Sequence, residues 1–512
     1  MKALLPAAVV ALALVLASGA SAESSEFAGH HRQVIPVVVV RGMTLGDLPA
    51  LANEGAAVGL LVPNAGPRTS QADAFAGMVR GILYNTRLAK PTDSVLIRTR
   101  KANEIPRKGP VIVVGLPPAT SAPNDRRYPI AVLAPGYSGV LQSDLTRVPG
   151  LVSMADVART ALQTSHALGS KPDGGNVAAL YELEEHIDVA RSSTMVGSVI
   201  VLLVLIAFAL VYPRGAPAAV ASALATNLAL GWMPMGDTAP RLALLGVCSV
   251  AGGILGARFM RNRTVLGIAL VSVLVAYAVT MIVQPSALSL APLGPELTSR
   301  FFGVSNLLET LLLVPALLGA QLLKQRFGWF AFIAVGILSL ATISENRLGA
   351  DGGGAVVVAV GFALLAVGTS WRRAVPALGI AALTVLGLLH LDAASSSPDH
   401  LRGALNGGLT GLADVAANRV PLAYARMLEQ WYLVFPLLAA VAICFAAKSP
   451  VIVALIGALA ASLLVNDSPG PVTLAGLAAV CALEGGLVRR TLVFPLLRRI
   501  APPVAAARPL EP

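Results

Sequence analysis

Charged residues are scarce in this sequence of 512 residues, because Asp, Glu, Lys and Arg together make up only 13% of it. Soluble domains contain roughly a quarter of such residues. The deficit excludes an ordinary soluble protein and indicates a polytopic membrane protein. The formal net charge of +11 comes without basic and aromatic residues interleaved on any soluble segment, so we expect no nucleic-acid partner.

Cysteine is also rare. The three cysteines, Cys248, Cys444 and Cys481, all fall in apolar stretches. Their positions exclude a disulfide framework and a CxxC metal site, and a small buried apolar residue is their default role. We assign no metal ligands, and the sequence identifies no cofactor.

The N-terminal residues 1–22 have the form of a secretory signal peptide. Lys2 precedes a short apolar run, and Ala20-Ser21-Ala22 matches an A-x-A cleavage site. An uncleaved anchor helix is the alternative. Either reading predicts that residues 23–190 are exported.

Long apolar runs recur after residue 190. A run of about 20 apolar residues suffices to cross the ~30 Å hydrocarbon core of a bilayer. We therefore predict a multi-pass helical membrane domain over residues 191–490 with about eleven spans, followed by a basic cytoplasmic tail over 491–512. The expected spans are 193–213, 216–233, 241–258, 264–284, 304–323, 327–344, 353–370, 374–391, 431–447, 450–466 and 470–488.

The charges of the loops predict an orientation. Every second loop is basic, as with Arg258, Arg261 and Arg263, whereas the intervening loops carry most of the acids. The positive-inside rule assigns the basic loops to the cytoplasm. We expect an N-terminal domain outside a bacterial plasma membrane and a cytoplasmic C-terminus.

The exported segment contains β-branched runs at 34–42, 109–118 and 128–136 that are typical of buried strands. Helical patterns lie between some of them, which predicts an α/β domain with a parallel sheet.

The order of these pieces, "VVVVRGMTLGDLPALANEGAAVGLL", "GPRTSQADAF" and "LQSDLTRVPGLVSMADVARTAL", resembles the alkaline phosphatase superfamily. In that family the first strand ends at a metal-binding Asp, where this chain has Val40-Arg41, and the late Asp-His pair reads Asp144-Leu145 here. The resemblance implies a degenerate, alkaline phosphatase-like domain without hydrolase activity. It places Thr69 or Ser70 at the nucleophile position, and Arg41 and Arg68 are candidate anion contacts.

Polar stretches interrupt the apolar runs at the predicted outer surface: "SRFFGVSNLLET" (299–310), "ENRLGADGGG" (345–354) and "NDSPGP" (466–471). Acids inside membrane spans are costly and mark functional sites. Structural alternatives remain at each stretch: Glu309 pairs with Arg300 or Arg347, Asp351 caps a helix, and Ser468 caps the next.

The three stretches together resemble a bacterial multi-pass membrane family with a degenerate phosphatase-like exported domain and no established activity. The resemblance supports one outward-facing polar site. The candidate catalytic residues are Asp351, Asp467 and Glu309. The candidate substrate-binding residues are Arg300, Asn306, Glu345, Asn346, Arg347, Gly352, Gly353 and Asn466.

These residues suit a membrane protein of cell-envelope assembly that handles a lipid-linked substrate bearing phosphate or a glycan. Arginines would hold the phosphate, and a carboxylate, Asp351 or Asp467, would serve as a base or as a metal ligand. A transporter or flippase is one alternative, and a non-catalytic scaffold with a pseudo-phosphatase domain is another. The sequence leaves open whether the protein is an enzyme. Membrane lipids and envelope proteins are the expected partners.

Overall fold

The structure is a computed structural model that describes most of the exported segment and of the membrane domain. It describes residues 34–62, 74–75, 78, 97–101, 104–116, 127–163, 167–172, 177–233, 236–259, 262–295, 302–345, 348–349, 352–368, 372, 375–376, 378–379, 428–447, 449–465 and 469–484. The chain divides into two compact units. Unit 1 comprises Met1–Asp188 and Glu296–Phe302, and unit 2 comprises Val189–Pro295 and Gly303–Pro512.

Unit 1 contains a sheet whose described strands run in the order β3-β1-β4-β5-β2-β6-β8, with β7 beside β2. The strands are β1 (Val37–Arg41), β2 (Ala57–Val62), β3 (Ile97–Lys101), β4 (Val111–Leu116), β5 (Tyr128–Leu133), β6 (Gly139–Gln142), β7 (Leu151–Ser153) and β8 (Gly169–Lys171). Every residue of β2, β4 and β5 is buried, which explains their unbroken apolar sequences.

The predicted parallel sheet is wrong, because the sheet is mixed. Strand β5 runs antiparallel to both of its neighbours, β4 and β2, although β1 is parallel to β3 and β4. Strands β4 and β5 are consecutive in the chain and adjacent in the sheet, an arrangement that needs no crossover helix. The expected alkaline phosphatase-like fold is therefore not found.

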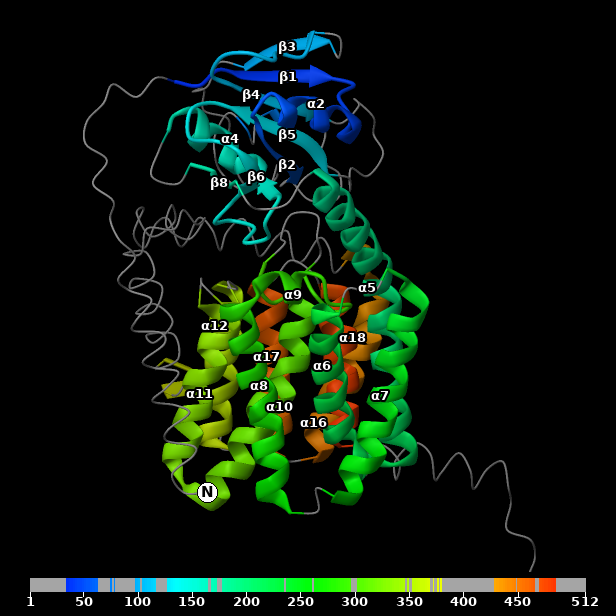
Figure 1. Ribbon diagram of the computed structural model, residues 1–512. Coiled ribbons are helices and arrows are strands. Elements are labelled where there is room, and N and C mark those ends of the chain that lie inside the picture. The colour runs from blue at the N-terminus through cyan, green and yellow to red at the C-terminus, as the bar shows by residue number, and fades with distance from the viewer. Residues whose placement is uncertain are drawn as a thin grey trace, which may run out of the picture. The chain divides into compact units, whose positions relative to one another are not determined.

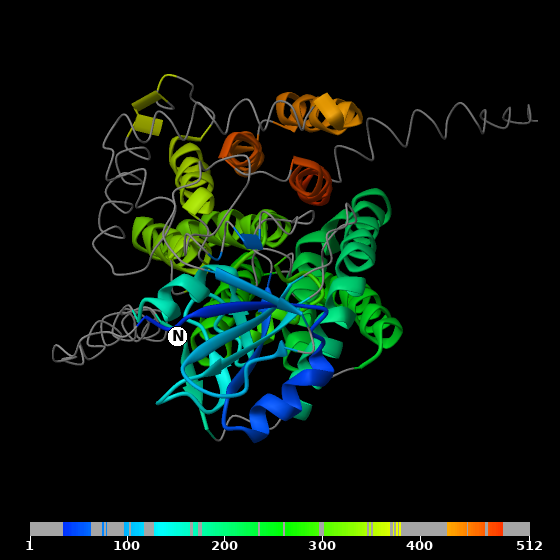
Figure 2. The same ribbon diagram turned by 90° about the horizontal axis from the view of Figure 1, so that it is seen from above.

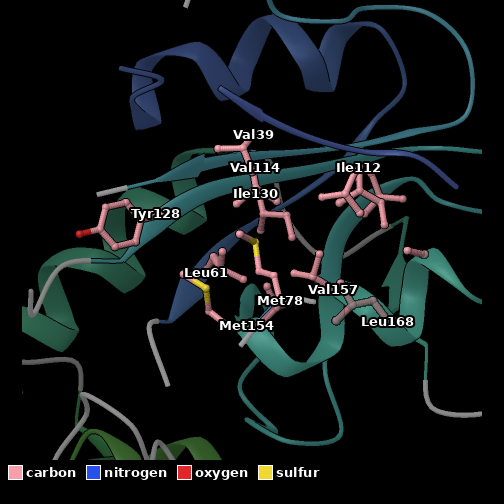
Figure 3. Close-up of a cluster of buried hydrophobic side chains, with 14 of the residues drawn as sticks. Val39, Leu61, Met78, Ile112, Val114, Tyr128, Ile130, Met154, Val157 and Leu168 are labelled. Atoms are coloured by element: carbon pink, nitrogen blue, oxygen red, sulfur yellow. The ribbon is translucent and has the colours of Figure 1, made fainter. Parts of the chain in front are cut away.

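Helices cover both faces of this sheet. Helix α4 (Met154–Ala161) packs Met154 and Val157 against Val39, Val114 and other side chains of the central strands (Figure 3). The 3-10 helix η1 (Leu45–Asp47) and helix α2 (Leu48–Asn53) follow β1, and α2 lies on the opposite face. The core of unit 1 thus lies in the two layers between the sheet and its helices.

Unit 2 is helical, and its helices lie side by side (Figure 1). Helix α5 begins in unit 1 and continues into unit 2. The elements are α5 (Val177–Val211), η3 (Pro213–Gly215), α6 (Ala216–Trp232), α7 (Thr238–Phe259), α8 (Arg263–Val283), α9 (Pro285–Ser289), α10 (Asn306–Phe327), α11 (Trp329–Ser344), α12 (Gly352–Val367), η4 (Trp431–Leu433), α16 (Val434–Ala447), α17 (Pro450–Val465) and α18 (Pro469–Leu483).

The prediction of about eleven spans is wrong. Within the described residues, only α5, α7, α8 and α10 are both long and apolar enough to cross a membrane. Helices α11, α12 and α17 have 16 residues each and α18 has 15, fewer than the ~20 that a span needs. The expected span at 374–391 lies almost entirely outside the described residues. The four long helices nevertheless make this a candidate membrane protein.

Helix α10 is the most enclosed of the four long helices and packs against α8, α11, α18, α17, α6 and α12. Helices α17 and α18, drawn in dark orange and red, are seen nearly end-on in Figure 2. Adjacent glycines bring α7 close to two neighbours. A Cβ on Gly252 would clash with the side chain of Ser222 in α6, and one on Gly253 would clash with the Phe208 ring in α5.

Candidate functional site

Glu309 is the one predicted catalytic residue within the described part of the chain, and it is fully buried. It lies in the first turn of α10, which Ser305 caps by accepting a hydrogen bond from the amide of Leu308 at 3.2 Å. The positive end of the helix dipole favours an ionised carboxylate there. Burying such a group costs several kcal/mol unless it is paired or solvated. Glu309 therefore marks a polar region inside unit 2.

The structure brings two of the three predicted stretches together. The amide of Val304 donates a hydrogen bond to the carbonyl oxygen of Gly349 at 2.9 Å, joining "SRFFGVSNLLET" to "ENRLGADGGG". Gly303 has a φ of 87°, which favours glycine. A Cβ on Gly349 would clash with the carbonyl oxygens of Ile343 and Thr342. Gly349 thus allows the chain to fold closely against the end of α11, in the position where its carbonyl accepts the hydrogen bond from Val304.

We call the Val304–Gly349 hydrogen bond and the two segments that it connects the joint. The other described candidate residues lie close to it in the chain. Asn306 is the half-buried first residue of α10. Glu345 is the half-buried residue that ends α11, and its carbonyl accepts from the amide of Leu348 at 2.9 Å. Gly352 and Gly353 are the first two residues of α12.

The third stretch is only partly described. Helix α18 begins there, at Pro469, and packs against α10. A Cβ on Gly470 would lie 2.9 Å from the side-chain oxygen of Gln430. Six predicted site residues lie outside the described residues: Arg300, Asn346, Arg347, Asp351, Asn466 and Asp467.

A network of hydrogen bonds that the sequence did not predict connects to the first turn of α10. The buried Asn227 of α6 donates to the hydroxyl of Tyr277 at 3.0 Å and accepts from the amide of Leu293 at 2.7 Å. The hydroxyl of Tyr277 donates to the carbonyl oxygen of Leu224 at 3.0 Å. The hydroxyl of Ser305 donates to the carbonyl oxygen of Leu293 at 3.3 Å. This hydrogen-bond network therefore connects α6 and α8 to the first turn of α10.

Arg241 was missed as well. Its side chain is buried at the start of α7 and donates to the carbonyl oxygens of Leu230 and Leu290. It thus satisfies backbone groups at the end of α6 and after α9. Both Asn227 and Arg241 are isolated polar residues in apolar runs, which is the signal that could have identified them.

In unit 1 the residues that carried the phosphatase resemblance form a structural cluster. The hydroxyl of Ser143 donates to the carboxylate of Asp156 at 2.6 Å, and the amide of Ser153 donates to it at 2.8 Å. Asp156 belongs to the capping box of α4. Burial raises the pKa of Asp156 to about 6, although both hydrogen bonds oppose the shift. Arg41 is exposed at the end of β1, and Arg68, Thr69 and Ser70 lie outside the described residues.

No group of three or more His, Cys, Asp and Glu side chains that could hold a metal ion occurs within the described part of the chain. The groups near the joint are carboxylates, hydroxyls, side-chain amides and backbone N–H groups. Such groups can bind a polar ligand and move protons. Comparisons of the chain with models of protein families, with curated proteins and with solved structures found no match.

Proposed function

We propose that this is an integral membrane protein of cell-envelope assembly, which handles a lipid-linked, phosphate-bearing substrate at the joint between the first turn of α10 and the end of α11. The observation that carries the proposal is the complete burial of Glu309 beside the Val304–Gly349 hydrogen bond. Arg300 and Arg347 belong to the two segments that this bond joins, and guanidinium groups suit phosphate oxygens. The expected location is a bacterial plasma membrane.

The charges of unit 2 support an orientation with this joint outside. Arg214, Arg258, Arg263 and Arg326 are exposed at the helix ends away from it. We call these ends, together with Lys324 in the last turn of α10, the basic end. By the positive-inside rule the basic end faces the cytoplasm. Unit 1 and the joint are then extracytoplasmic, and the C-terminus is cytoplasmic.

The test uses the full chain in lipid nanodiscs with two probes of equal chain length, a polyprenyl pyrophosphate and the matching polyprenol. We expect the pyrophosphate to raise Tm more than the polyprenol, because only the pyrophosphate offers anionic oxygens to the arginines. Arg347→Gln should lose this difference. Arg326→Gln, at the basic end, is the matched control and should keep it. Equal shifts with both probes would refute the proposal.

Glu309→Gln keeps the side-chain shape and removes the charge. If Glu309 acts on the substrate, the variant should fold, insert and retain the pyrophosphate-dependent Tm shift while losing turnover of the probe. If Glu309 instead pairs with Arg300 or Arg347 as a structural bridge, the variant should lower the Tm of the ligand-free protein and lose the shift.

A transporter or flippase is the second candidate. It is favoured by the irregular chain after α9, Leu290–Pro295, which is largely buried within the helical unit, because broken helices and buried acids also mark transport pathways. Proteoliposomes containing a fluorescent polyprenyl pyrophosphate distinguish the two functions. Transport predicts that the label becomes accessible to a quencher on the opposite side without any chemical change. Catalysis predicts a change in the mass of the lipid.

A further inference from the structure

The three tryptophans of unit 2 that the structure describes lie at helix ends and are exposed. Trp232 ends α6 and is 44% exposed, Trp329 begins α11 and is 53% exposed, and Trp431 begins η4 and is 65% exposed. Tyr432 beside Trp431 is 52% exposed. Large exposed aromatic side chains with one polar atom are typical of the boundary between hydrocarbon and head groups in a membrane.

Polar groups accompany two of these rings. The indole N–H of Trp232 donates to the hydroxyl of Thr280 at 3.4 Å, near the end of α8. The ammonium of Lys324, at the basic end, lies 3.4 Å from the centre of the Trp329 ring. Lys and Trp side chains at a bilayer surface place their apolar parts in hydrocarbon and their polar atoms in water. Trp232 and Trp329 therefore fit opposite surfaces of one bilayer.

Hydrogen bonds indicate how deep the start of α10 lies. We measure depth along the helix axes from Trp232 and call it the level of a residue. Asn227 is five residues before Trp232 on α6, about 7 Å along the axis. Asn227 binds the amide of Leu293, whose carbonyl binds Ser305. Two hydrogen bonds thus separate the start of α10 from Asn227, and we take the two to lie near the same level. Glu309 is three residues after Asn306 along a helix that runs away from this end, so it lies about 12 Å from the level of Trp232.

The chain between α8 and α10 also lies deeper than Trp232. A Cβ on Gly231 would clash with the carbonyl of Ala287, so α9 packs at the level of Gly231. The chain then passes inward to Leu293. Irregular backbone at membrane depth requires partners from the protein. Asn227 and Arg241 supply them to Leu293 and Leu290.

The distance to the basic end agrees with one membrane thickness. Lys324 is about 27 Å further along α10 than Asn306, and therefore about 34 Å from the level of Trp232. The hydrocarbon core is ~30 Å thick, and moderate helix tilt accounts for the difference. A bilayer can thus have Trp232 at one surface and Lys324 with Trp329 at the other.

We propose that the exposed aromatic residues Trp232, Trp329, Trp431 and Tyr432 bind the head-group boundaries of the bilayer, so that residues 284–295 pass below the membrane surface and Glu309 lies at hydrocarbon depth. The partner of this surface is the phospholipid interface. The polar joint at Val304 and Gly349 is then reached from below the membrane surface, the level at which the head group of a lipid can enter from the side.

The test measures depth by fluorescence quenching of the full chain in phosphatidylcholine liposomes. Single-tryptophan variants are made by changing the other tryptophans, Trp371 included, to Phe. The liposomes carry a nitroxide either near the head group or near the end of the acyl chain. Trp232, Trp329 and Trp431 should lose more fluorescence with the shallow nitroxide than with the deep one.

Exposed positions on α8 provide the matched depth markers. Ala276 and Ser272 are exposed and lie about 6 Å and 12 Å before Thr280, the partner of Trp232. In the tryptophan-free background, Ala276→Trp should be quenched at intermediate depth and Ser272→Trp most strongly by the deep nitroxide. The proposal is overturned if Trp232 is quenched more by the deep nitroxide, or if Ser272→Trp is quenched more by the shallow one or by aqueous iodide.

Discussion

The side-chain oxygen of Asn227 accepts a hydrogen bond from the amide of Leu293 at 2.7 Å, 66 residues further along the chain. Asn227 has no exposed surface. This contact connects a regular helix to the irregular segment that precedes α10. One amide side chain therefore helps to set the position of the first turn that carries Glu309.

Removing this side chain should be costly. Asn227→Ala leaves the buried amide of Leu293 without its acceptor, a loss of about 1–3 kcal/mol of stability. We expect a clear fall in Tm of the detergent-solubilised protein, measured by intrinsic fluorescence. Gln325→Ala, at an exposed position of α10, is the control and should change stability by less than about 0.5 kcal/mol. Equal Tm values for the two variants would contradict the role of Asn227.

Gly349→Ala should move residue 349 away from the end of α11 and so weaken the hydrogen bond that its carbonyl accepts from Val304. The added Cβ would clash with the carbonyl oxygens of Ile343 and Thr342, which are backbone atoms and cannot rotate away. We expect a loss of more than about 1 kcal/mol and faster hydrogen exchange at the amide of Val304. Gly236→Ala is the matched control, since no atom lies within 4 Å of its added Cβ. Unchanged exchange at Val304 in Gly349→Ala would show that the bond does not depend on close approach.

Unit 1 should become less stable as pH rises from about 4 to 6. The pKa of Asp156 is raised by burial from 3.8 to about 6, so the folded state binds its proton more tightly than the unfolded state. Deprotonation through this window therefore costs up to about 3 kcal/mol. Hydrogen exchange of the α4 amides in the full chain, corrected for intrinsic rates, should show protection falling across this range.

Asp156→Asn should flatten that pH dependence, because the amide does not titrate. Glu182→Gln, at an exposed position of α5, should leave it unchanged. Protection that stays constant from pH 4 to 6 in the unaltered protein would contradict the assignment.

Arg127→Met should destabilise unit 1 strongly. The guanidinium is 1% exposed and lies 2.6 Å from Glu184 and 2.5 Å from Asp188, which are one turn apart on α5. Without it the two carboxylates repel each other, but they are 20% and 65% exposed and are solvated, so the expected loss is that of hydrogen bonds to charged groups, about 1.5–3 kcal/mol. Arg107→Met removes an exposed pair with Glu54 and should cost at most about 1 kcal/mol. Urea-induced exposure of unit 1 to limited proteolysis distinguishes the two variants.

Sequence patterns predicted where most described helices lie but not how long they are. The apolar runs at 264–284 and 450–466 correspond closely to α8 and α17. Hydropathy reports which residues avoid water, and it does not reveal where a helix ends. Helix α12 ends at Val367, where Gly368 has a φ of 72°, whereas the apolar run predicts a span that reaches residue 370.

Strand positions were similarly predictable, whereas strand direction was not. A run such as Tyr128–Leu133 is apolar because both faces of the strand are covered, which is true of a buried strand in either orientation. The burial of Glu309 could be anticipated from its place in an apolar run. The contacts of Asn227 with Leu293 and of Val304 with Gly349 could not, since they join residues far apart in the chain.

The glycine pair of α7 has a consequence for inheritance. Gly252 lies against Ser222 and Gly253 against Phe208, so two successive codons each specify contact with a different neighbouring helix. Every amino acid that a single nucleotide change can substitute for glycine adds at least a Cβ atom. Missense changes at these codons therefore disturb helix packing directly, and a smaller residue in place of Ser222 or Phe208 would make room for the added Cβ.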